Sequence, residues 1–293
     1  MNDLPWTLVV EPEQRETARL RIEEASVVGV DTEYDSFRYF REKLCLVQVS
    51  TDTGVYLFDP LGQQDMSFLG GVFSNPDVIK VLHASDNDVR ILHRDHDFTF
   101  SSIFDTHRAA ALLGSTFLSL PAILKEYLNL ELPKNKKIQR SRWDTRPLSE
   151  AQLDYAARDA ACLLPLYRAM TLLLRERGLE GEARGQFDEV AAGRWREKRL
   201  VPGGFRKIEG YEDLDDEARF RLEALWRWRF EKARSTNRAR FMILSDKNLV
   251  DIAREEVTSL DDLVTSGLIT SHQAREIGEE LLQVLDCSFS EYL

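Results

Sequence analysis

Apolar and polar residues along the first half of the chain form patterns that predict strands and helices in turn. Three β-branched, apolar runs predict strands at residues 26–32, 44–50 and 54–58, because such residues suit a buried, pleated surface. The links between these runs are short, which favours antiparallel pairing. Beyond them we expect helices and one further strand; the helices are at 67–73, 87–93, 105–113 and 120–128, and the strand is at 79–83. This order predicts an α/β fold, a mixed sheet flanked by helices.

From residue 149 onward the pattern is almost entirely helical. Ser149 and Gln152 have the spacing of a capping box, which predicts a helix from there to about residue 175. The charged stretch up to residue 200 is also expected to be helical. Val-Pro-Gly-Gly at 201–204 is the clearest break in the chain. Helical patterns follow it at 218–234, 246–253, 259–266 and 272–285. We therefore predict an α/β domain with a trailing helical linker at 1–203 and a small all-α domain at 204–293.

Composition narrows the classes of protein that the chain can represent. Of its 293 residues 43% are hydrophobic and 30% are charged, the balance of a soluble globular protein. No apolar run approaches the roughly 20 residues that a membrane span needs, so we expect no membrane association. The three cysteines, Cys45, Cys162 and Cys287, are widely spaced. This spacing favours buried, reduced thiols in a cytoplasmic protein over a disulfide framework or a thiolate metal site.

Two carboxylates stand at the end of the first predicted strand. Because side chains alternate between the faces of a strand, Asp31 and Glu33 lie on the same side. Neighbouring carboxylates repel each other unless a cation neutralises them. Hard divalent ions such as Mg²⁺ and Mn²⁺ take such oxygen ligands. Two solvated carboxylates at a strand end are the alternative, and this motif alone does not exclude it.

Three further candidates lie later in the chain. Asp88 falls in the first turn of a predicted helix, where the helix dipole favours a carboxylate. Tyr155 and Asp159 are four residues apart and therefore share one helix face. Small alanines surround them and leave room for a ligand to approach. Each residue also has a purely structural interpretation: Asp88 at a helix start, Tyr155 in a core and Asp159 on a surface.

Together and in this order, the motifs resemble the DEDDy 3′→5′ exonucleases of the ribonuclease H-like fold, and more narrowly the ribonuclease D family. Other parts of the resemblance are the runs at 44–48, 58–62, 83–84, 105–106, 146–148 and 155–157. The resemblance implies that two divalent metal ions, Mg²⁺ or Mn²⁺, are held by four acids; these are Asp31, Glu33, Asp88 and Asp159. It also implies that Tyr155 is a catalytic tyrosine that orients the attacking water.

Two basic regions are candidates for binding nucleic acid in a chain whose net charge is −11. The first precedes the Tyr155 helix, and we expect its cations to contact phosphates; they are Lys136, Lys137, Arg140 and Arg142. A solvated basic loop is the alternative. The second spans 219–240 and includes Arg227 and Arg229. Residues 210–285 resemble the HRDC domain, which implies help in holding nucleic acid. Alternatively, these arginines pair with the acids at 212–217 and serve only the domain's own fold.

The function that the resemblance implies is metal-dependent 3′→5′ exoribonuclease activity that releases 5′-mononucleotides. The expected partner is RNA with a free 3′ end, such as a tRNA precursor or another structured RNA; no protein partner can be inferred. A 3′→5′ DNA exonuclease is an alternative, because it has the same catalytic set. A nucleic-acid-binding protein without catalysis is another, although the presence of all five catalytic positions argues against it.

Overall fold

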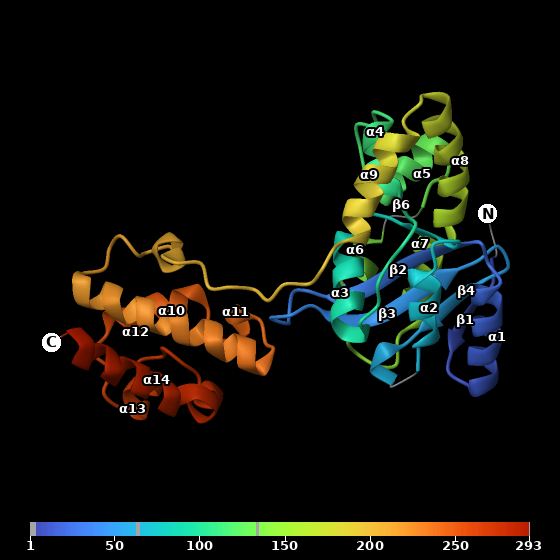
Figure 1. The fold of residues 1–293 in the computed structure, drawn as a ribbon. Helices are drawn as coiled ribbons and strands as arrows, with labels where there is room; N and C mark the ends of the chain where they lie inside the picture. Colours follow the sequence, from blue (N-terminus) through green and yellow to red (C-terminus); the bar gives the residue numbers. More distant parts are fainter. Residues whose placement is uncertain (1–3, 63–64, 133–134, 293) are drawn as a thin grey trace. The chain divides into compact units, whose positions relative to one another are not determined.

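The computed structural model describes residues 4–62, 65–132 and 135–292 and divides into two compact units (Figure 1). The first unit contains Met1–Asp35 and Lys43–Arg196, and the second contains Ser36–Glu42 and Glu197–Leu293. The chain thus passes into the second unit a few residues before the break at 201–204. The segment 36–42 also belongs to the second unit, which the sequence analysis did not anticipate, because only contacts with residues far along the chain place it there.

A six-stranded mixed sheet forms the centre of the first unit, with strand order β1-β4-β3-β2-β5-β6. Its strands are β1 (Trp6–Val9), β2 (Val27–Asp35), β3 (Lys43–Ser50), β4 (Val55–Phe58), β5 (Ile79–Leu82) and β6 (Ile103–Asp105). β2, β3 and β4 form the antiparallel meander that their short links predicted. β1, β5 and β6 each pair in parallel with a neighbour. The predicted mixed sheet is confirmed.

Helices cover both faces of this sheet. They are α1 (Pro12–Glu23), α2 (Phe68–Ser74), α3 (Asp86–His96), α4 (Thr106–Leu112), α5 (Leu120–Leu128), α6 (Lys136–Gln139), α7 (Glu150–Ala161), α8 (Leu163–Glu176) and α9 (Glu180–Ala191), with a 3₁₀ turn at Pro60–Gly62. Apolar residues of α1, α2 and α3 share one core with Val28 and Val30 of β2. On the opposite face α7 packs against β2, β3 and β4. β2 therefore lies between two helical layers.

Several local predictions for the first unit were wrong. The single helix expected from 149 to about 175 is divided at Cys162 into α7 and α8, because Pro165 lacks the N–H that a continuous helix would donate to Ala161. Residues 193–200 have no regular structure, although a helix was expected. β1, α1 and β6 were missed. β1 and β6 are very short, and α1 buries only Ala18 and Ile22, too little to form an apolar stripe.

The second unit is helical, as predicted. It contains a 3₁₀ turn at Gly204–Lys207 and the helices α10 (Asp216–Thr236), α11 (Arg240–Ile243), α12 (Asp246–Arg254), α13 (Leu260–Thr265) and α14 (Ser271–Tyr292). Side-chain caps begin three of these helices; the capping residues are Asp215, Ser245 and Ser259. Trp226 is buried in the core with Leu222 and Leu225. The α11 turn was not predicted.

The described cysteines agree with the prediction made from the sequence. Cys45 and Cys162 are buried free thiols, and burial raises the pKa of each to about 12. Cys287 lies outside the described side chains. Among the residues that the structure describes, no helix combines the length and apolarity that a bilayer crossing requires.

Candidate active site

Strand β2 presents Asp31 and Glu33 on the face that α7 covers. A glycine on that face allows α7 to approach closely. A Cβ at Gly29 would lie 2.3 Å from the Ser50 Oγ and 3.0 Å from the Ala160 carbonyl oxygen. In the space left free, the Ser50 hydroxyl donates a hydrogen bond of 2.8 Å to that same carbonyl. The carboxyl-terminal half of α7 is thereby held against the part of β2 that leads into the two acids.

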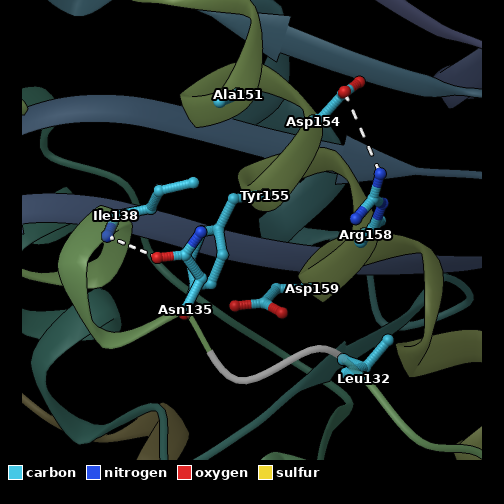
Figure 2. A pocket seen from close by; sticks show the side chains of 8 residues that line it. All are labelled: Leu132, Asn135, Ile138, Ala151, Asp154, Tyr155, Arg158 and Asp159. Carbon is cyan, nitrogen blue, oxygen red and sulfur yellow. Dashed lines mark hydrogen bonds and ion pairs between the residues drawn. The ribbon is translucent and has the colours of Figure 1, made fainter.

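Helix α7 brings Tyr155 and Asp159 to this face. The predicted capping box at Ser149 begins the helix, and the buried alanines at 156, 157 and 160 let it lie close to the sheet. Figure 2 shows Tyr155 and Asp159 projecting from α7 towards the segment that carries Asn135. Asp31, Glu33 and Asp159 each offer a carboxylate oxygen, and these oxygens lie within 4.8 Å of one another.

Asp88 approaches the same acids from the first turn of α3. It is buried, and its Oδ1 accepts a hydrogen bond from the hydroxyl of Thr32. Although Asp88 lies outside the 4.8 Å group, its charge raises the pKa of Asp31 and of Glu33. Sequence reasoning missed Thr32. The sequence did contain a signal for Thr32. It is a hydroxyl residue between the two acids, and its side chain lies on the opposite face of an otherwise apolar strand.

The electrostatics of the site disfavour ionised carboxylates. Burial is the largest cause that raises the pKa of Asp31 and Glu33 well above the usual values, and the neighbouring acids raise both further. Burial also raises the pKa of Asp88 and of Asp159 to about 6. The pKa of Tyr155 is raised above its ordinary value by burial and then by the charges of Asp159 and Glu33. Its phenol therefore stays protonated at neutral pH.

These residues fit a divalent cation. No described lysine or arginine forms an ion pair with Asp31, Glu33 or Asp159, so the clustered carboxylates have no protein counter-charge. Gln48, the β3 residue opposite Asp31, is fully buried, and neither atom of its amide group hydrogen-bonds within the described residues. An all-oxygen donor set is the kind that Mg²⁺ and Mn²⁺ prefer. Sequence reasoning did not single out Gln48.

A cleft of about 910 Å³ connects the acids with one of the predicted basic residues. Asp31, Tyr155, Asp159 and Lys136 all line it, together with His83. Burial lowers the pKa of His83 to about 4, so this imidazole is neutral. The structure thus brings Lys136 to the acidic cluster. The cleft has the volume of a small-ligand pocket.

The other basic residues predicted in the segment before α7 do not line this cleft. Lys137 and Arg140 are exposed and do not line the cleft. Arg142 donates hydrogen bonds of 2.7 and 2.9 Å to the carboxylate of Asp144. Arg146 fixes the end of the segment through hydrogen bonds of 2.5 and 2.6 Å to the Asp59 carboxylate. The segment is therefore anchored beside the cleft, while only part of its charge faces it.

In the second unit the structure corrects one predicted contact. Arg229 was expected at a nucleic-acid surface, but it is only 3% exposed, because it lies on the face of α10 that packs inside the domain. It donates hydrogen bonds to the Leu244 carbonyl at 2.7 Å and to Asp246 at 2.6 Å. Arg227 is exposed and pairs with Glu223 at 2.6 Å. Arg229 therefore stabilises its own domain.

Comparison with known proteins now identifies the class. The 3′-5′ exonuclease family matches residues 8–175, more than half of the chain, and the HRDC domain matches residues 219–285. The chain belongs to the 3′-5′ exonuclease family and carries an HRDC domain after its exonuclease domain. The resemblance to ribonuclease D is confirmed by the relatives that follow.

Two relatives illustrate the similarity in sequence. Ribonuclease D of Haemophilus influenzae is 30% identical over 90% of this chain, which spans 66% of that protein. The Exosome complex component 10 homolog of Drosophila melanogaster is 33% identical over 82% of this chain, which spans 27% of that protein. The chain thus covers less than two thirds of the length of either relative.

Solved structures confirm the fold. The catalytic core of RRP6 from Trypanosoma brucei matches 99% of this chain and 81% of its own, with a TM-score of 0.88 at 23% identity. Escherichia coli RNase D, described as an exoribonuclease involved in structured RNA processing, matches 98% of this chain and 75% of its own, with a TM-score of 0.72 at 25% identity. NrnC of Brucella melitensis with bound Mg²⁺ matches 59% of this chain and 85% of its own, with a TM-score of 0.53 at 25% identity.

Proposed function

We propose that this chain is a metal-dependent 3′→5′ exoribonuclease that releases 5′-mononucleotides from RNA with a free 3′ end. The observation that carries the proposal is the convergence of Asp31, Glu33 and Asp159, with Asp88 beside them and Tyr155 one helical turn from Asp159. The ribonuclease D and exosome relatives support RNA as the substrate class. Processing of tRNA precursors or other structured RNA, in the cytoplasm, is part of the proposal.

The acids would hold two divalent ions, Mg²⁺ or Mn²⁺. When bound, such ions neutralise charge on the scissile phosphate and lower the pKa of the attacking water. Asp31 and Glu33 come from one rigid strand and Asp159 from a helix packed against it. Their spacing is therefore set by the fold before any ligand arrives, and preorganisation of this kind avoids rearrangement during the reaction.

Tyr155 would act as a hydrogen-bond donor rather than as a base. A free phenol has a pKa of about 10, and the surroundings of Tyr155 raise it further. Its hydroxyl therefore keeps its proton and can orient the attacking water against the phosphate. Thr32 would act as a positioning residue, because its hydroxyl holds the carboxylate of Asp88.

The basic side of the cleft would bind the substrate backbone. Lys136 shares the cleft with Asp31 and Asp159, so its ammonium group can neutralise a phosphate of the terminal nucleotides. Lys137, Arg140 and Arg142 would add weaker contacts along the same segment, and Arg227 would do so in the HRDC domain. Mutation of Lys136 should therefore weaken substrate binding more than mutation of Arg142.

A cleavage assay on matched substrates tests this function. Single-stranded RNA and DNA of the same sequence, each labelled at the 5′ end, are incubated with Mg²⁺, with Mn²⁺ or with EDTA. We expect stepwise shortening of the RNA from its 3′ end, 5′-mononucleotide products and no reaction in EDTA. Asp31→Asn serves as the inactive variant, and a 3′-blocked RNA as the inert substrate. Absence of hydrolysis with either metal contradicts the proposal, and faster cleavage of the DNA would favour a DNA exonuclease.

A further inference from the structure

A second cleft lies wholly within the second unit and shares no residue with the acidic cluster. Its volume is about 760 Å³. Three stretches of the chain line it: part of the 36–42 segment, the stretch from Lys198 to Ile208, and residues of α10, α11 and α12. All of these stretches belong to the same compact unit. The cleft is therefore formed by residues of the second unit alone.

The 36–42 segment is seated firmly as one wall of this cleft. The backbone N–H of Ala239 donates to the Arg38 carbonyl at 2.9 Å, and the backbone N–H of Arg41 donates to the Asn237 side chain at 2.8 Å. The ring of Phe40 is buried and meets the ring of Phe230 edge-on, with 5.1 Å between the centroids. The wall is therefore held by backbone hydrogen bonds and by core packing.

An exposed aromatic pair stands at this wall. Phe37 is 66% exposed and Phe241 is 48% exposed, and their ring centroids are 4.8 Å apart. Contiguous exposed apolar surface marks an interaction site more often than singly scattered apolar side chains do. Aromatic faces are the stacking platforms of proteins that bind single-stranded nucleic acid, because every base has a π-face.

The cleft also carries positive charge that the protein does not neutralise. Arg199, Lys207 and Arg240 are exposed lining residues and form no ion pair within the described part of the chain. The one acid among the described lining residues is Asp246, which pairs with Arg229 at 2.6 Å. In a chain with a net charge of −11, this local excess of cations selects an anionic ligand.

From this combination we propose that the second cleft binds a single-stranded segment of RNA, with a base stacked against Phe37 and Phe241 and with phosphates held by Arg199, Lys207 and Arg240. The choice of RNA as the ligand rests on the proposed function. The cleft itself is an additional binding site, built where the β2–β3 connection joins the HRDC domain. An acidic peptide would use the cations but would gain little from the aromatic pair, so RNA fits both features.

Binding of a fluorescent single-stranded RNA to the full chain in EDTA tests the proposal, because the chelator prevents cleavage. We expect Phe37→Ala and Phe241→Ala each to weaken binding about tenfold, within the range of one lost base–aromatic stack. The double variant Arg199→Ala/Arg240→Ala should make the slope of log affinity against log salt shallower by about 1.4, which is about 0.7 per phosphate contact. All four side chains are exposed, so the melting temperatures should not change.

Two matched variants control for loss of bulk and of charge. Leu172→Ala removes an apolar side chain that is 62% exposed in the exonuclease unit, and Lys247→Ala removes an exposed cation of the HRDC unit that pairs with Asp251. Both should bind RNA like the wild-type protein. If the Phe37 and arginine variants also bind RNA like wild type, the proposal is overturned, and a peptide becomes the better candidate for the cleft.

The same experiment separates failure of this site from failure of the proposed function. If the wild-type protein hydrolyses RNA but the cleft variants bind it normally, only the second site fails. If no RNA is hydrolysed while the cleft variants lose binding, the second site stands and the exonuclease proposal fails. Hydrolysis of a dinucleotide, whose single phosphodiester must lie at the acidic cluster to react, should proceed at the same rate in the variants and in the wild type.

Discussion

The charge of Asp31 destabilises the metal-free protein and stabilises the metal-bound protein. We therefore predict that the order of the melting temperatures of wild type and Asp31→Asn reverses when metal is added. Without metal, Asp31, Glu33 and Asp159 share a partly buried space, and no lysine or arginine in the described part of the chain forms an ion pair with them. Replacing Asp31 with Asn removes one of the repelling charges and keeps the shape. We therefore expect metal-free Asp31→Asn to be more stable than metal-free wild type at pH 7.5, and to gain far less stability from Mg²⁺ or Mn²⁺.

The raised pKa of Asp31 sets the sign of this effect, and the pKa of the neighbouring Asp159 sets its scale. Burial raises the pKa of Asp159 to about 6, against about 3.9 in an unfolded chain. An acid with a raised native pKa loses stability as pH rises from the unfolded to the native value, here from about 4 to 6. A shift of roughly two units corresponds to at most about 3 kcal/mol. In a domain of about 200 residues, 1–3 kcal/mol moves the melting temperature by roughly 2–10 °C.

Thermal melts in EDTA and in saturating Mg²⁺ or Mn²⁺, at pH 5 and at pH 7.5, measure this effect. For the wild type, the melting temperature should rise more on metal addition at pH 7.5 than at pH 5, because protons compete with the metal for the same oxygens. Asp31→Asn should show a small rise at both pH values. Equal metal-induced shifts in the two proteins, or a wild-type shift that does not grow with pH, would refute a metal site built on these carboxylates.

Three further variants test other parts of the site. Tyr155→Phe should lower the single-turnover rate about 10–10³-fold, the range of a lost positioning hydrogen bond, with the melting temperature unchanged; a wild-type rate would make Tyr155 a packing residue only. Thr32→Val should weaken Mn²⁺ binding about tenfold or more, because a hydrogen bond to a charged group is worth about 1.5–3 kcal/mol. Calorimetry measures this affinity. Rescue of the affinity by Thr32→Ser distinguishes this role of Thr32 from lost packing. Gly29→Ala should lower stability by roughly 1–3 kcal/mol in denaturant melts, because its Cβ would come too close to the Ser50 Oγ. Gly181→Ala, at a helical position with open space around it, is the matched control and should be as stable as wild type or up to about 1 kcal/mol more stable.

The periodicity of the sequence was sufficient to predict which site residues lie together on one strand or on one helix. The two-residue repeat of a strand placed Asp31 with Glu33, and the helical repeat placed Tyr155 near Asp159. Convergence of the two pairs depends on Gly29 and Ser50, which allow α7 to reach the sheet, and neither residue stands out in the sequence. The hydrogen bond between Thr32 and Asp88 joins two residues more than fifty positions apart, and no local pattern announces it.

The arginines of α10 show why local charge does not reveal a nucleic-acid surface. Residues 219–240 appear strongly basic when counted alone, yet many of these cations are paired. Some partners lie within α10, as Glu223 does for Arg227, and others come from another helix: Lys232 pairs with Glu280 at 2.6 Å, and Arg238 with Glu276 at 3.2 Å. Local and long-range pairing together therefore neutralise much of the face that sequence counting favoured. Within the described chain, Arg199, Lys207 and Arg240 have no such partners, and all three line the cleft beside Phe37 and Phe241. Cations left unpaired by the fold can neutralise a ligand's phosphates without breaking an existing ion pair, so in this unit RNA should bind more tightly at the cleft than along the face of α10, where Arg227 adds only a weaker contact.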